Sequence, residues 1–177
     1  MTITRIPIAV GNLIEIAGIL FALYFIVMTP EVTPVLLKLI LYLAAWGCLL
    51  FFPHSLTHYV TGRFVGVRFL YYSFGKSSVY KLGIPFVSVI ASRSRVLTLK
   101  VDRGSLQSVG RGGLIAMFSS GAVASMLFPF LVAFASFRDL PIAFSVFLLL
   151  LSAANLLFDL YFSPKAGDIS RAISVAK

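Results

Sequence analysis

Apolar residues run in four long stretches along this chain, and each stretch is long enough to cross a lipid bilayer. A transmembrane helix needs roughly 20 consecutive, mostly apolar residues. The stretches cover residues 8–28, 35–58, 114–137 and 141–162. We therefore predict an α-helical polytopic membrane protein with about four spans, which form a single membrane domain over residues 1–177.

The segment between the second and third stretches, about residues 63–111, has a different pattern. Apolar and polar residues alternate in VGVRFLYYSFG (65–75) and RVLTLKVD (95–102), which is the period of a β-strand. A third candidate strand is VYKLGIPFVSVIAS (79–92). In the first candidate strand, one side would carry Val65, Val67, Phe69 and Tyr71. We predict a small β element of two to four strands, which either packs on the helices or pairs with an extended peptide.

Composition agrees with the membrane assignment. Hydrophobic residues make up 59% of the chain and charged residues only 12%, with a mean hydropathy of +1.00. Soluble domains carry about 25% charged residues. A soluble globular protein is therefore excluded, and the lipid bilayer is the first expected partner.

The net charge of +9 is distributed unevenly and predicts the topology. With four spans, both termini and residues 63–111 share one side of the membrane, and only Lys38 and Arg138 of the fifteen basic residues fall on the other. Basic residues near span ends favour the cytoplasm, so we expect a multi-pass protein with both termini cytoplasmic. Orientation and attraction to anionic lipid account for the basic residues, and no nucleic-acid partner is expected.

The chain has two histidines, His54 and His58, which follow Pro53 near the end of the second stretch. Residues four apart on a helix lie on the same face, one turn from each other. Two imidazoles in this position can hold one metal ion. The simpler alternative is that both rings reach toward lipid headgroups at the interface.

Four other polar residues complete the candidate set: Glu15 in the first stretch, Asn155 and Asp159 in the fourth, and Asp168 in the tail. The second and fourth spans run in the same direction, so the histidines and the tail should meet at one membrane face. Two imidazoles and one carboxylate, with a fourth position open, form a catalytic zinc arrangement.

Three segments together resemble the site-2 protease family of intramembrane zinc metalloproteases. HSLTH (54–58) is similar to the HExxH helix of the family, and TGRFVGVRF follows it as the exit into a β region. FSSGAVASML (118–127) is similar to the GPxxN turn, and NLLFDLYFSPKAGDI (155–169) to the NxxP…DG segment.

The resemblance implies zinc held by His54, His58 and Asp168, with Asn155 positioning the substrate. The longer spacing from Asn155 leaves Asp159 as an alternative ligand. The GPxxN turn departs from the family pattern, because Gly121 is followed by Ala122 and the Asn position holds Ser125.

The most consequential departure is Ser55, which stands where the family has the glutamate that acts as general base. A serine hydroxyl is too weakly basic for that role. We therefore expect a zinc-binding pseudoprotease that binds a membrane-protein segment or partner protein without efficient cleavage. Two alternatives stay open: an active intramembrane zinc metalloprotease with Glu15 or Asp159 as an unusual base, and a structural subunit of a larger membrane complex.

Overall fold

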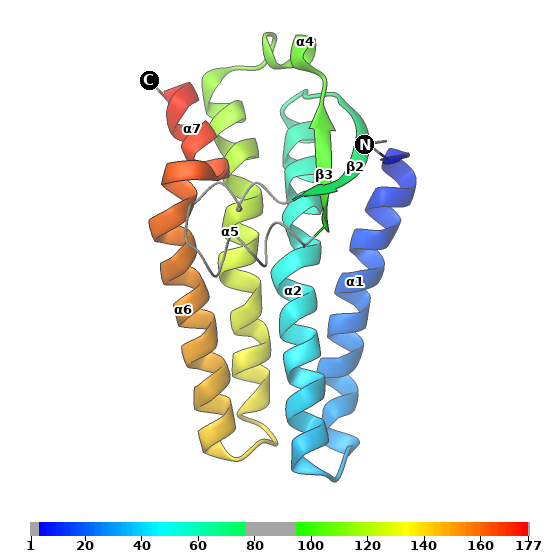
Figure 1. The fold of residues 1–177 in the computed structure, drawn as a ribbon, viewed down its shortest axis with the longest axis vertical. Coiled ribbons are helices and arrows are strands. Elements are labelled where there is room, and N and C mark those ends of the chain that lie inside the picture. Colours follow the sequence, from blue (N-terminus) through cyan, green and yellow to red (C-terminus); the bar gives the residue numbers. More distant parts are fainter. Residues whose placement is uncertain (1–3, 77–94, 177) are drawn as a thin grey trace.

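Four long helices run side by side along the length of the molecule (Figure 1). The computed structural model describes residues 4–76 and 95–176. The long helices are α1 (Ile8–Met28), α2 (Val35–Phe64), α5 (Arg111–Ser136) and α6 (Ile142–Ala166). Each is long and apolar enough to cross a membrane. The predicted helical polytopic fold is confirmed.

A small antiparallel sheet lies beside α1 and α2 at one end of the bundle (Figure 1). Its strands, in the order β1-β2-β3, are β1 (Thr4–Ile6), β2 (Phe69–Lys76) and β3 (Arg95–Val101). The predicted β element is confirmed, although β1 is too short for a period-two pattern to have revealed it. The candidate strand at 79–92 lies outside the described residues. The remaining short helices are η1 (Thr29–Glu31), α4 (Arg103–Leu106) and α7 (Asp168–Ala176).

Helix α2 continues six residues beyond the predicted end of its span and stops at a glycine. Gly66 has a φ of +96°, a conformation that favours glycine. The amide of Val67 donates to the carbonyl of Gly62 at 2.8 Å, which closes the end of the helix. The two histidines therefore lie within a continuous helix and not at its frayed end.

A register shift between Phe69 and Tyr71 interrupts the alternation in β2. Because of this irregularity, Tyr72 is the fully buried aromatic residue, whereas Tyr71 is partly exposed. The strict alternation predicted for this strand is not kept. The hydroxyl of Tyr72 donates to Asn12 Oδ1 at 2.8 Å and so ties the sheet to α1.

The opposite end of the bundle is held by a charged cluster between the two helix-connecting turns. Lys38 Nζ lies 3.1 Å from Asp139 Oδ2, and both side chains are nearly buried. The buried Tyr42 donates its hydroxyl hydrogen to Asp139 Oδ1 at 2.6 Å. The cluster lies next to the apolar core between the four long helices. This core consists of Ala22, Tyr42, Ala45, Leu49, Val132, Ala133, Leu140 and Leu148.

A proline usually ends or kinks a helix, but Pro164 does not end α6. Helix α6 passes through Pro164 and ends at Ala166. Gly167 alone separates it from α7, and a side chain there would contact Ser163 closely. Asp168 is consequently the first residue of α7, which packs against α5 and α6.

Candidate metal centre

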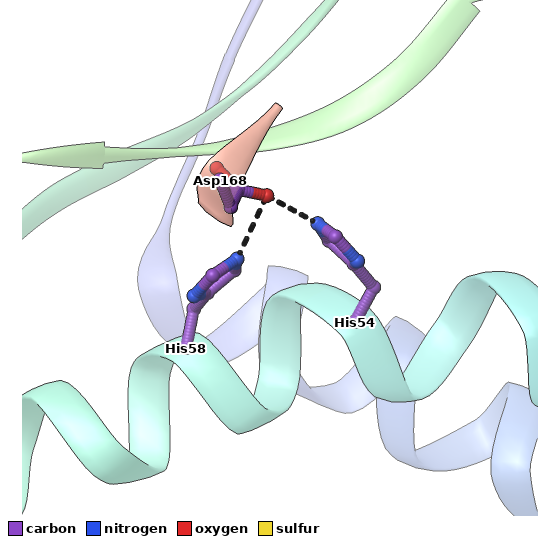
Figure 2. A group of neighbouring side chains, drawn as sticks. All are labelled: His54, His58 and Asp168. Atoms are coloured by element: carbon purple, nitrogen blue, oxygen red, sulfur yellow. Dashed lines mark hydrogen bonds and ion pairs between the residues drawn. The ribbon is translucent and has the colours of Figure 1, made fainter. Parts of the chain in front are cut away.

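Three side chains converge at the end of the bundle that carries the sheet: His54 and His58 from α2, and Asp168 from α7 (Figure 2). Nε2 of His54 lies 3.1 Å from Asp168 Oδ2, and Nε2 of His58 lies 3.2 Å from the same oxygen. The sequence predicted both the shared helix face of the histidines and their approach to this aspartate. The geometry confirms that the three residues lie together.

The second ring nitrogen of His58 has a backbone partner. Nδ1 of His58 lies 2.6 Å from the carbonyl oxygen of Met117 on α5. Since a carbonyl oxygen only accepts, Nδ1 carries the hydrogen, and in the neutral ring Nε2 then presents its lone pair. Metal-ligating histidines use this arrangement, in which the outer nitrogen donates to a carbonyl and the inner one faces the ion.

His54 has a side-chain partner from the same helix α5. Its Nδ1 lies 2.9 Å from Ser125 Oγ. Asn155 on α6 donates from Nδ2 to the carbonyl oxygen of Ser125 at 3.0 Å. Asn155 therefore forms a hydrogen bond between α6 and α5, and it is connected to His54 only through Ser125. The sequence identified Ser125 only as a departure from a family pattern, not as a partner of His54.

The convergence brings the Nε2 atoms of His54 and His58 against Oδ2 of Asp168, and all three are electron-rich atoms when the rings are neutral. Burial raises the pKa of the Asp168 carboxyl, but hydrogen bonds from His54 and His58 outweigh burial and hold this pKa well below its ordinary range when both rings donate, which for His58 requires a second proton. Asp168 is therefore a carboxylate at neutral pH. Holding this carboxylate against two imidazole nitrogens requires a positive charge. Either a second proton on a ring or a metal ion supplies that charge.

The donor set fits zinc. Two imidazole nitrogens and a carboxylate oxygen are ligands that zinc accepts at about 2.0–2.2 Å, which separates tetrahedral ligand atoms by about 3.3 Å. The two nitrogen–oxygen separations of 3.1 and 3.2 Å are close to that value, and all three ligand atoms lie within 4.8 Å of one another. His54, His58 and Asp168 could therefore hold such an ion with little movement.

The remaining candidates lie around this group rather than in it. Asp159 on α6 is not among the three converging residues. Ser55 is buried, and its hydroxyl donates to the carbonyl oxygen of Leu97 on β3 at 3.3 Å. Glu15 is buried on α1 and is not among the three converging residues, and its Oε2 has no hydrogen-bond partner among the described residues.

Comparison of the chain with protein-family models, with curated proteins and with solved structures gives no match.

Proposed function

We propose that this chain is a membrane-embedded zinc protein of the site-2 protease type, with His54, His58 and Asp168 as the metal ligands. The observation that carries the proposal is the convergence of both Nε2 atoms on one carboxylate oxygen, with Nδ1 of His58 bonded to a backbone carbonyl. A mere headgroup contact would not require a carboxylate between the two rings. An imidazolium–carboxylate ion pair is the competing explanation, and metal content distinguishes the two.

The proposed role of this centre is recognition of a membrane-spanning segment of a partner protein rather than its efficient cleavage. When bound, zinc polarises a carbonyl group and activates water for attack. Efficient hydrolysis also needs a general base, whose contribution is about 10²- to 10⁴-fold in rate. Ser55, which stands in the position of the family's base, cannot supply it. The function we propose is therefore that of a pseudoprotease.

The proposed topology follows from the charge distribution. Both termini, the sheet and α7 lie at the same end of the bundle (Figure 1), as four spans require. We propose that this end faces the cytoplasm, because Lys38 and Arg138 are the only basic residues expected on the other side. The metal centre would then lie near the cytoplasmic interface.

Metal analysis of the purified protein tests the proposal. We expect close to one zinc per chain, and loss of the zinc in His58→Asn and in Asp168→Asn, because each removes one of three ligands. Asp159→Asn is the matched control on a neighbouring carboxylate and should retain the metal. If the folded wild-type protein binds no metal at equilibrium with micromolar zinc, then His54, His58 and Asp168 form an ion pair and not a metal centre.

A further inference from the structure

Three of the long helices contain an internal proline: Pro53 in α2, Pro129 in α5 and Pro164 in α6. A proline has no amide hydrogen, so the carbonyl group four residues before it loses its usual helical hydrogen bond. In a membrane span, such a carbonyl group is tolerated when a neighbouring helix supplies a donor. Among the described residues, the carbonyl group freed by Pro129 is the only one of the three that receives a side-chain donor.

The carbonyl group that Pro129 frees belongs to Ser125. The side-chain amide of Asn155 on α6 donates to it at 3.0 Å. Pro129 is fully buried and Ser125 is 7% exposed, so water has little access to replace this donor. Pro129 therefore creates a need for a hydrogen-bond donor on α5, and Asn155 supplies that donor from α6.

The side chain of Ser125 is directed to the metal centre. Its Oγ lies 2.9 Å from Nδ1 of His54, and Nε2 of the same ring lies 3.1 Å from Asp168 Oδ2. In the tautomer that binds metal through Nε2, Nδ1 carries the hydrogen and donates to the Ser125 hydroxyl. The backbone and the side chain of a single residue thus connect Asn155 with one of the three ligands.

We propose that Asn155 is a positioning residue of the metal centre, and that Pro129 is the reason it has this role. By holding the carbonyl group of Ser125, Asn155 fixes the backbone from which the Ser125 hydroxyl orients the ring of His54. This inference rests on the proposed metal centre. It gives Asn155 a part in holding a ligand, which differs from the substrate contact that the family resemblance implies.

The proposed role makes the effect of Asn155 depend on residue 129. If residue 129 carried an amide hydrogen, α5 itself would satisfy the carbonyl group of Ser125, and Asn155 would not be needed to hold the backbone there. A general contribution of Asn155 to helix packing would be the same whichever residue occupies position 129. The dependence on Pro129 therefore separates positioning from packing.

Two double-mutant cycles on the full chain in detergent test the proposal, with zinc affinity measured by titration against a competing chelator. Asn155→Leu keeps the side-chain volume but cannot donate. We expect it to lower zinc affinity about threefold, the effect of one hydrogen bond between membrane helices. In a Pro129→Ala background, where α5 supplies the missing amide hydrogen, Asn155→Leu should leave zinc affinity unchanged.

The second cycle uses Ser125→Ala, a small change that keeps the helix intact. Because this background has no hydroxyl to orient His54, Asn155→Leu should again leave zinc affinity unchanged. The visible absorption of the cobalt-loaded protein reports ligand geometry. It should change with Asn155→Leu in the wild-type background and in neither of the other two.

Ser152→Ala is the matched control on α6. It removes the acceptor of another hydrogen bond between helices, the one from Nε1 of Trp46 at 2.9 Å, and should change neither zinc affinity nor the cobalt spectrum. Bound metal with the same threefold loss in either background would overturn this inference alone, as would unchanged affinity in Asn155→Leu. Absence of bound metal from the wild type would overturn both proposals.

Discussion

The imidazole of His58 on α2 packs directly against the backbone of Gly121 on α5. A methyl group at Gly121 would overlap Nε2 of His58, the atom that faces Asp168. The absence of a side chain at this position is therefore what allows the ring to reach the centre. The sequence marked Gly121 as part of a possible turn, whereas in the structure it lies inside a continuous helix.

Gly121→Ala should consequently displace the His58 ring and weaken metal binding. We expect a loss on the order of 10–100-fold in zinc affinity, comparable to the removal of an outer-shell partner. Titration with a competing chelator measures it. Gly112→Ala on the same helix, where an added methyl group meets nothing within 4 Å, is the matched control. Equal affinity of the two variants would contradict the close approach of α5 to the ring.

Ser125→Ala should also weaken the centre, because it removes the partner of His54 Nδ1 at 2.9 Å. An unrestrained imidazole binds metal less well, and we expect a reduction on the order of tenfold in zinc affinity. Asn155→Ala leaves the Ser125 hydroxyl in place and should have a smaller effect on affinity. A larger effect of Asn155→Ala than of Ser125→Ala would show that Asn155 has a more direct role.

The Lys38–Asp139 pair should stabilise the end of the bundle away from the metal centre. Asp139→Ala leaves the nearly buried ammonium group of Lys38 and the hydroxyl of Tyr42 without their carboxylate. Breaking a buried pair in this way costs about 3–5 kcal/mol of unfolding free energy. The double variant Lys38→Met/Asp139→Leu should recover much of the loss in thermal unfolding measurements in detergent. Equal stability of Asp139→Ala and the wild type would mean that water reaches the pair.

Cysteine accessibility in intact cells tests the orientation. In a Cys48→Ala background, which removes the only native thiol, Thr33→Cys should react with an impermeant maleimide. Ser108→Cys should react only after the membrane is opened. Both positions are exposed. Thr33 lies in the connection between η1 and α2, and Ser108 lies in the connection between α4 and α5, which is at the other end of the bundle. Labelling of Ser108→Cys from outside would reverse the proposed topology and place the metal centre at the external face.

Much of the fold could be predicted because its signals are local. The first span, residues 8–28, coincides with α1, since apolar length alone defines a membrane helix. Boundaries that depend on neighbours were less accurate. Helix α2 runs to Phe64 because Gly66 ends it, and Pro164 lies within α6 although prolines usually mark a helix end. The burial of Tyr72 instead of Tyr71 depends on a strand irregularity that alternation cannot encode.

The sequence by itself determined the membrane helices and the pairing of His54 with His58, because hydropathy and helical spacing act within one segment. It also indicated that Asp168 shares their face. Only the tertiary structure decided that Asp168 rather than Asp159 meets both rings. The physical reason is that these helices are apolar over most of their surface, so their pattern does not reveal which side faces a neighbour. The rotation of each helix about its own axis is decided by close contacts between residues that are distant in the sequence. The clearest such contact is the one at Gly121, where the missing side chain leaves room for the ring of His58.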